Sequence, residues 1–510
     1  MTDAMQPAAR AEPDAFLPSL GAELEMAVID RTGASACVGD GYFLALAALR
    51  RAHGPVALTR QGGAIIGLSS GIGVNGIDNG FNLLETAHAP VPPATDGLSV
   101  LARRMAADLD DVLAALATQG LTLTALAQHP TAGIAPGDYA RRVAPKSIYR
   151  YLNDQRGWHH AVGIDAKAQN GPTTEVSPDH AIAALNLLLT ASPVFIALFA
   201  NSPFEGGAPT GLMDTRMTLW PRMVAGSRVA ADRARCGLPP RLFRSIGDYW
   251  AWTFGPGSVA QAMPLASGDY KGDSDLWVVG DGRLSVPQLF RQPGVPARRL
   301  GDGRPGRLVP TAAHFAYLQW SNFLDFRLRF VFADPPPERQ EIAAAFDEPG
   351  LFDGLFASRL SNLYIENRCA GATFPDAALR ASAGDDLAGG AMIAPAALQA
   401  GLVSAARRDQ AAFLARWPLS RIRLLREHAI RHALGRPGAR SPDAGSAAAL
   451  QALCDEVLDL SEHHLLPAGR PALRYARWVR QTGLTGAYRA LAATAGCQDL
   501  NDLSLRLKVG

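Results

Sequence analysis

The stretch LGAELEMAVID, residues 20–30, raises the question on which the fold of this chain depends. Its apolar residues predict a buried β-strand, yet it also carries two acids, Glu23 and Glu25. Side chains at positions i and i+2 of a strand point to the same face, so both carboxylates are aimed at one spot. Burying an unpaired carboxylate is unfavourable unless a cation neutralises it. The strand therefore predicts a cation-binding surface on a sheet.

Two further predicted strands carry charged residues where apolar ones are expected. NLLETA contains Glu85, and LYIENRCA contains Glu366 and Arg368 two positions apart. If these strands are neighbours of residues 20–30, four carboxylates converge and repel one another unless a divalent cation is present. Oxygen-only ligands suit Mg²⁺ or Mn²⁺ better than zinc. For any one of these acids alone, an edge strand or a structural salt bridge is the ordinary alternative.

Two histidines and one arginine extend this candidate site. We predict a strand over 158–165, in which His159 and His160 face opposite ways, so that one of them faces the carboxylates. For either histidine, a hydrogen-bonded core residue or an ordinary surface residue is the alternative. Arg368 beside metal-binding acids fits a phosphate or carboxylate ligand. Metal and arginine together are typical of phosphoryl transfer, although no GxxxxGK[ST] loop and no GxGxxG turn after a strand is present.

The composition indicates a core-forming protein of the reducing cytoplasm. Of the 510 residues, 48% are hydrophobic and 19% are charged, and the net charge of +2 gives no reason to expect nucleic acid as a partner. The five cysteines are far apart and form no CxxC motif. Residues 1–17 are polar and rich in Ala and Pro, so we expect a disordered lead without an export signal.

The remaining pattern favours an α+β class rather than regular βαβ alternation. We predict strands over 121–130 and 361–371, two short strands within 63–87, and a helix over 97–119. Residues 181–200 are apolar enough to imitate a membrane span, but a buried helix broken at Pro193 is the better interpretation. Residues 255–310 are interpreted as irregular loops or an insertion, and 435–446 as a linker within an otherwise helical region beyond about 395.

Several motifs together resemble the glutamate–cysteine ligase family. ANSPFEGGAPTG, which is followed by Arg216 and Trp220, is similar to a loop of that family. GAELEMAVID resembles its opening strand, RGWHHAVGID its Gly-x-His strand, and YIENR its Glu/Arg strand. APAALQAGLV and YWAWTF look like the plant and proteobacterial branch. The motifs occur in the family's order over most of the chain, and it is their combination that is specific.

The resemblance implies a glutamine synthetase-like fold, in which an antiparallel sheet forms an open funnel with helices behind it. The catalytic domain would span residues 18–434, and a helical region, 446–510, would pack on it. The implied cofactors are ATP and Mg²⁺, or Mn²⁺. The implied reaction phosphorylates the γ-carboxylate of L-glutamate and joins it to the amino group of L-cysteine, as in glutathione-type thiol biosynthesis. We expect only small-molecule substrates as partners, no membrane, a monomer or homodimer, and a cytoplasmic location.

The resemblance also assigns roles to individual residues. The implied metal ligands are Glu23, Glu25, Glu85, Glu366 and His159, which matches the family's Gly-x-His position. Glu366 and Arg368 are the implied catalytic pair, and Arg368 and Glu25 are the implied contacts to ATP. Arg216 is expected to bind the α-carboxylate of the amino acid, with Asn201 shaping the loop and His160 also on the substrate side.

Departures from the family pattern leave the amine acceptor open. Ala161 stands where part of the family has a second histidine, residues 166–177 look inserted, and 255–310 are hard to match. One alternative is a γ-glutamyl ligase of the same fold that uses another amine, for example in secondary metabolism. A non-catalytic binding protein on this fold and a metal-dependent hydrolase are alternatives of other classes.

Overall fold

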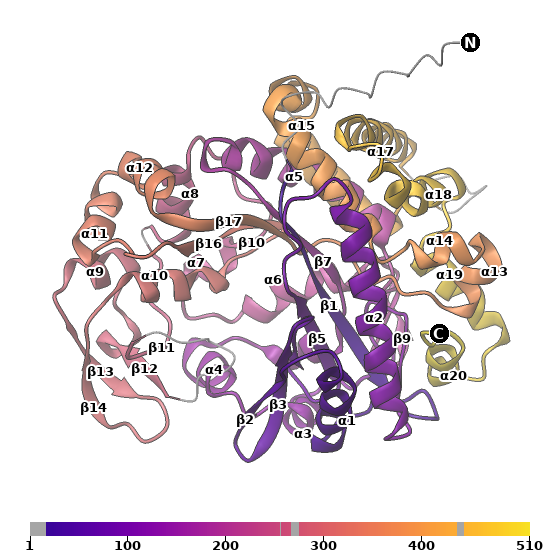
Figure 1. The fold of residues 1–510 in the computed structure, drawn as a ribbon, viewed down its shortest axis with the longest axis horizontal. Coiled ribbons are helices and arrows are strands. Elements are labelled where there is room, and N and C mark those ends of the chain that lie inside the picture. The colour runs from indigo at the N-terminus through magenta and orange to yellow at the C-terminus, as the bar shows by residue number, and fades with distance from the viewer. Residues whose placement is uncertain (1–16, 256, 267–274, 436–442) are drawn as a thin grey trace, which may run out of the picture.

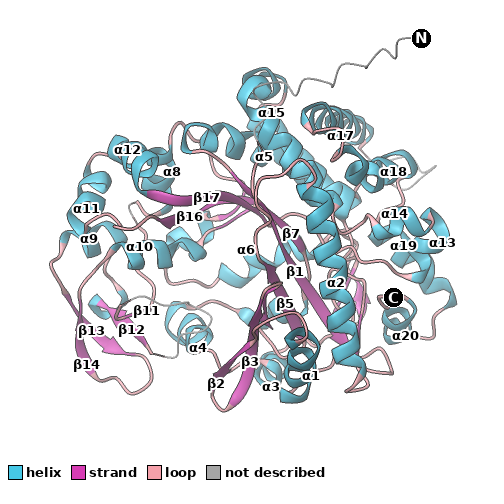
Figure 2. Ribbon diagram, viewed as in Figure 1, coloured by secondary structure: helices cyan, strands magenta, loops and turns pink. Residues whose placement is uncertain are grey.

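The chain folds around one large antiparallel sheet with helices packed on its outer face (Figure 1 and Figure 2). The computed structural model describes residues 17–255, 257–266, 275–435 and 443–510. Within these residues the sheet has nine strands. Their order across the sheet is β16 (Phe326–Phe332), β17 (Leu360–Asn367), β7 (Asn170–Glu175), β1 (Leu20–Ile29), β5 (Leu83–His88), β4 (Gly73–Ile77), β3 (Ala64–Ser70) and β2 (Ala57–Gln61), and β6 (Thr122–Leu123) pairs with the end of β1.

Strand β1 is central in this sheet and confirms the strand predicted from residues 20–30. It pairs with β5 on one side, where Glu25 lies opposite Glu85, and with β7 on the other. Leu24 and Met26 are fully buried on the other face. Alternation along β1 therefore separates an apolar face from a face that carries acids, as the period-2 pattern predicted.

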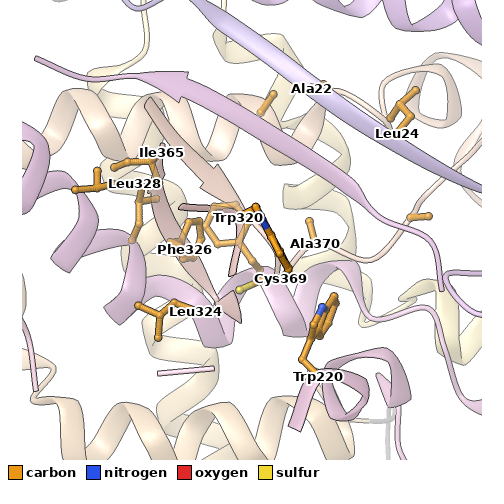
Figure 3. Packing of buried hydrophobic residues seen from close by; sticks show 14 of the residues in the cluster. Ala22, Leu24, Trp220, Trp320, Leu324, Phe326, Leu328, Ile365, Cys369 and Ala370 are labelled. Atoms are coloured by element: carbon orange, nitrogen blue, oxygen red, sulfur yellow. The ribbon is translucent and has the colours of Figure 1, made fainter. Parts of the chain in front are cut away.

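The apolar face is covered by helices. Helix α5 (Pro178–Phe199) and helix α15 (Ala394–Arg416) cross behind β16, β17 and β7, while α1 (Asp40–Arg51) and α2 (Gly97–Ala117) cover β1 and β3. Gln399 of α15 donates hydrogen bonds to Thr174 Oγ1 and to the carbonyl of Ile365, both at 3.0 Å. Ile365 and Leu328, which are paired across β17 and β16, lie together in this core (Figure 3).

Helix α5 is the core helix that residues 181–200 predicted. By length and composition alone it could span a membrane, but 89% of its most apolar window is buried inside the protein. The prediction that Pro193 breaks the helix is wrong, because one helix runs from Pro178 to Phe199 with Pro193 inside it. Pro193 and its neighbours are buried, and tertiary packing outweighs the local preference of proline.

Residues 255–310 are more regular than the sequence suggested. Strands β11 (Met263–Pro264), β12 (Leu276–Val279), β13 (Val295–Arg299) and β14 (Pro305–Leu308) form a smaller antiparallel sheet. With α9 (Val286–Arg291) they lie at the left of Figure 1, near α10 (Ala312–Leu318) and α11 (Arg339–Asp347). Strands this short within a segment rich in Gly, Pro and Arg give little period-2 signal, so the sequence pattern is typical of loops.

Other predicted elements differ in detail. Residues 63–87 contain three strands rather than two, and the strand predicted over 121–130 is reduced to β6. The strand predicted over 158–165 is wrong, since this segment forms two 3-10 turns, His160–Val162 and Ile164–Ala166. Part of the apparent insertion, residues 166–177, is instead strand β7, which lies between β17 and β1. The predicted helix over 97–119 is confirmed.

The C-terminal part is helical, as predicted, and the chain end returns to the large sheet. Its helices are α16 (Leu419–His432), α17 (Ala444–His464), α18 (Arg474–Thr482), α19 (Gly486–Ala493) and α20 (Leu500–Arg506). Helix α17 packs on α15, α16 and α5, and the amide of Val509 donates to the carbonyl of Leu123 at 3.0 Å. The α+β class with an antiparallel sheet is thus confirmed. The division into domains stays a prediction, and residues 1–16 and 436–442 lie outside the described part.

Candidate active site

A cavity of about 560 Å³ lies on the acid-bearing face of the large sheet. Five strands each contribute residues two positions apart to its wall, which places all of these side chains on one face. They are Glu23 and Glu25 of β1, Glu85 and Ala87 of β5, Thr173 and Glu175 of β7, Arg327 and Arg329 of β16, and Tyr364 and Glu366 of β17. Strands β2, β3 and β4, loops and the short helices α4 (Ser147–Tyr151) and α6 (Leu219–Val224) also contribute to the wall.

Three of the predicted metal ligands meet in this cavity. Glu23, Glu25 and Glu85, called the carboxylate trio below, bring one oxygen each to within 4.8 Å of one another. The cross-strand pairing of Glu25 with Glu85 and the i, i+2 spacing of Glu23 and Glu25 produce this arrangement. Glu25 is buried, and among the described residues its Oε2 has no hydrogen-bond partner. Three carboxylates with an unsatisfied buried oxygen fit a Mg²⁺ or Mn²⁺ ion.

Lys167 and Asp78 complete the acidic side of the cavity, and the sequence interpretation missed both. Lys167 Nζ lies 2.5 Å from Glu25 Oε1 and 3.0 Å from Asp78 Oδ2. Burial opposes the charge of Lys167, but Asp78 and Glu25 raise the pKa of the lysine above its ordinary value. Burial raises the pKa of Glu25, and the negative charges of Asp78 and Glu85 raise it further, whereas Lys167 lowers it. The acidic side therefore carries more negative charge than this one lysine neutralises.

Glu366 lies in the same cavity but in a different group. Its carboxylate contacts Arg327 at 2.6 Å, Arg368 at 3.0 Å and Arg329 at 3.6 Å. Strand β7 lies between β17 and β1, and Glu366 pairs with Thr173, which pairs with Gly21. The predicted convergence of four carboxylates is therefore corrected: three converge, and the fourth is held two strands away by the arginines.

The three arginines and Glu366 form the arginine cluster of the cavity. Burial would raise the pKa of Glu366, but Arg327, Arg329 and Arg368 hold it well below its usual range. Arg368 also lies over the rings of Trp220 and Phe323, with its guanidinium carbon 5.0 and 5.4 Å from their centroids. With three guanidiniums against one carboxylate, the cluster can bind an anion such as a phosphate.

We expect Glu366→Gln to lower the free energy of unfolding by about 3 kcal/mol, because it leaves buried guanidiniums without their counter-charge. Since the pKa of Glu366 is depressed in the folded state, its stabilising effect is fully present above the ordinary carboxyl pKa and is lost as the pH falls from there through the much lower folded-state pKa. Urea titrations of both proteins should give a large difference at pH 7 that is still large at about pH 4 and shrinks as the pH falls further toward about 2.5. An equal difference at about pH 2.5 and at pH 7 would contradict this account.

Of the two adjacent histidines, only His160 lies where the prediction put it. His159 is exposed and does not line the cavity, whereas His160 is buried in the cavity wall. Burial lowers the pKa of His160 to about 4, so the ring is neutral at pH 7. Because the segment is a 3-10 turn rather than a strand, the family's Gly-x-His spacing did not identify the inward side chain. The assignment of His159 as a metal ligand is therefore corrected, and His160 is the histidine that faces the site.

Arg216 and Asn201 do not line the cavity and are corrected as substrate contacts. Arg216 is fully buried behind the wall, where it donates to the carbonyl of Arg368 at 3.0 Å and stacks on Trp220. Asn201 donates to the carbonyls of Ala125 and Ala372 at 2.7 and 2.8 Å. Both residues hold the loops that carry the site, in agreement with the expectation that Asn201 shapes its loop.

An aromatic wall closes one side of the cavity. Trp158, Trp320, Phe323 and Tyr149 line it together with His160. Trp158 packs edge-to-face against Phe323 at 5.5 Å and against Trp320 at 6.0 Å. Figure 3 shows Trp320 and Trp220 near the carboxyl end of the Glu/Arg strand, where Cys369 and Ala370 follow. The cavity thus offers acidic, basic and aromatic surfaces to a ligand.

The first half of the chain, which carries the acidic side of the cavity, matches a known protein family. Residues 19–255 match the model of Glutamate-cysteine ligase family 2 (GCS2). The resemblance inferred from the motifs is confirmed for this part of the chain. The matched range contains the carboxylate trio, Asp78 and Lys167, whereas Glu366 and Arg368 lie beyond its end. The match does not distinguish branches of the family, so the plant and proteobacterial branch stays a prediction.

Solved structures of two enzymes resemble this chain at low sequence identity. The glutamate–cysteine ligase of Francisella tularensis in complex with AMP has a TM-score of 0.49 at 12% identity, over 96% of this chain and 88% of that one. A bifunctional glutathione synthetase from Pasteurella multocida has a TM-score of 0.45 at 11% identity, over 96% of this chain and 51% of that one. No curated protein matches the sequence.

Proposed function

We propose that this protein is an ATP- and Mg²⁺-dependent ligase that joins the γ-carboxylate of L-glutamate to an amine, with L-cysteine as the first candidate acceptor. One observation carries the proposal: a single cavity holds the carboxylate trio on β1 and β5 and the arginine cluster on β16 and β17. Carboxylates that hold a metal ion and arginines that bind oxyanions are the two requirements for phosphoryl transfer from a nucleotide. The family match over residues 19–255 supports a ligase.

The proposed reaction has two steps. An oxygen of the substrate γ-carboxylate attacks the terminal phosphorus of ATP, and ADP leaves. The amine nitrogen then attacks the acyl carbon, an N–H proton is lost, and the bond from carbon to phosphate oxygen breaks to release inorganic phosphate. A metal ion held by the carboxylate trio would neutralise phosphate charge. Arg368, whose charge is favoured by Glu366, Glu25 and Glu23 against the effect of burial, would donate hydrogen bonds to the phosphoryl oxygens.

A second candidate acceptor is an amine with an apolar or aromatic side chain, which the wall of Trp158, Trp320, Phe323 and Tyr149 favours. Rings of this kind contribute apolar contact area and stack with other rings. A cysteine side chain would use little of that area. The amine preference therefore distinguishes L-cysteine from an acceptor with a larger apolar or aromatic side chain.

The test measures phosphate release from ATP with Mg²⁺ and L-glutamate, with each amine added in turn and L-cysteine first, and identifies the product by mass spectrometry. Cysteine-dependent release with γ-glutamylcysteine as product is the expected result. Release that needs glutamate but prefers another amine supports the ligase with the second acceptor class. If no amine elicits release, the ligase proposal is wrong and the cavity serves another purpose.

A further inference from the structure

A lysine ammonium already lies among the acids of the candidate active site. Lys167 Nζ is 2.5 Å from Glu25 Oε1 and 3.0 Å from Asp78 Oδ2, and its side chain is only 3% exposed. An ammonium is a compact charge that two carboxylates can share, much as they share a metal ion. Lys167 thus bridges the two acids as a cation that is covalently part of the chain.

The backbone holds this lysine in place from both sides. Lys167 directly follows the 3-10 turn Ile164–Ala166, and Ala168 and Gln169 connect it to strand β7. The amide of Ala168 donates to the carbonyl of Ala127 at 2.7 Å. The amide of His129 donates to the carbonyl of Ala166 at 2.8 Å. Because the neighbouring backbone is paired on either side, the ammonium is positioned by the sheet rather than by a mobile loop.

The two oxygens of Glu25 have different surroundings. Oε1 accepts a hydrogen bond from Lys167, whereas Oε2 is buried and has no hydrogen-bond partner in the described residues. Glu25 also belongs to the carboxylate trio, so one carboxylate lies between a fixed ammonium and a group that fits a metal ion. A second divalent ion between Glu25 and Asp78 would have to displace the ammonium of Lys167, which already lies within 3.0 Å of both carboxylates. A divalent ion and an ammonium that both contact these carboxylates would repel each other strongly.

We propose that Lys167 fills a second cation position, between Glu25 and Asp78, so that the nucleotide-free protein binds one divalent ion at Glu23, Glu25 and Glu85. This inference rests on the metal-dependent ligase proposed above and specifies its metal content. The built-in cation cannot be removed by a chelator. It also keeps Glu25 and Asp78 in place when the divalent ion dissociates.

The test is a Mn²⁺ titration of the full-length, nucleotide-free protein, in which free Mn²⁺ is measured by electron paramagnetic resonance. We expect one tightly bound ion per chain in the wild type and two in Lys167→Met, which keeps the length of the side chain and removes its charge. Lys146→Met is the matched control. Lys146 is also buried in the cavity wall, but it donates to the backbone carbonyls of Ile77 and Asp78, so we expect its Mn²⁺ count to stay at one.

The outcomes separate this inference from the proposed function. Two or more ions in the wild type, or one ion in Lys167→Met, would overturn the role of Lys167 and leave the ligase standing. No bound ion in the wild type would overturn the metal-dependent ligase as well. Lys167→Gln serves the same test if Lys167→Met fails to fold. Adding Asp78→Asn to the lysine variant should return the count to one, because the second site needs that carboxylate.

Discussion

Replacing Arg368 with alanine should lower kcat/KM for ATP-dependent ligation by about 100-fold to 1,000-fold, the effect typical of losing a preorganised charge that stabilises a transition state. Arg368 lines the cavity, lies 3.0 Å from Glu366 and is held over Trp220 and Phe323. Its guanidinium therefore has one defined position. Arg368→Lys should recover only part of the rate, because an ammonium cannot form paired hydrogen bonds with a phosphate.

The fold should survive this change, since Glu366 keeps Arg327 and Arg329 as partners. Steady-state rates and a thermal unfolding curve, measured on the same preparations, separate lost catalysis from lost stability. Arg222→Ala is the control, because Arg222 pairs with Glu205 outside the cavity. Near-wild-type turnover in Arg368→Ala would remove the arginine cluster from the proposed mechanism.

The strand pattern predicted the acidic side of the site because it depends on short-range geometry. Glu23 and Glu25 are two residues apart on one strand, so their shared face follows from the sequence alone. That Glu85 joins them also depends on the pairing of β1 with β5, which the structure shows; the family resemblance implied only that Glu85 is a ligand of the same site. The carboxylate trio could therefore be predicted residue by residue.

The position of Glu366 could not be predicted in the same way, because it depends on the order of strands. LYIENRCA shows an acid on a buried strand, but not that β7 lies between this strand and β1. Strand β7 was itself missed, since NGPTTE contains Gly and Pro and few β-forming residues. Lys167, which lies just before this strand, gave no signal for the same reason.

The sequence also carries a signal for the arginine cluster. FRLRFVF, which forms β16, has Arg327 and Arg329 two apart between buried Phe and Leu residues, the same pattern that drew attention to Glu23 and Glu25. The same rule predicts two guanidiniums on one face of that strand. Asp78 carried a weaker signal, because an Asp-Asn-Gly sequence is equally typical of an ordinary turn.

Replacing Glu25 with glutamine should have an effect as large as the loss of Arg368. Glutamine keeps the shape of the side chain but removes a negative charge that the carboxylate trio and Lys167 both use. Loss of a residue that only supports a metal ligand typically lowers metal affinity by about 10-fold to 100-fold. Because Glu25 would be a ligand itself, we expect the affinity for Mn²⁺ to fall by at least this much. We expect kcat/KM to fall by about 100-fold or more, because phosphate charge is then poorly neutralised.

Two comparisons make this result specific to Glu25. Glu205→Gln removes an acid that binds Arg222 outside the cavity, and it should leave both Mn²⁺ binding and turnover close to wild type. Raising the Mg²⁺ concentration should restore part of the rate of Glu25→Gln if weakened metal binding is the cause. A variant with wild-type Mn²⁺ affinity would show that the metal ion binds elsewhere. The paired acids of residues 20–30 would then serve only to hold Lys167, and the question raised by that strand would have a purely structural answer.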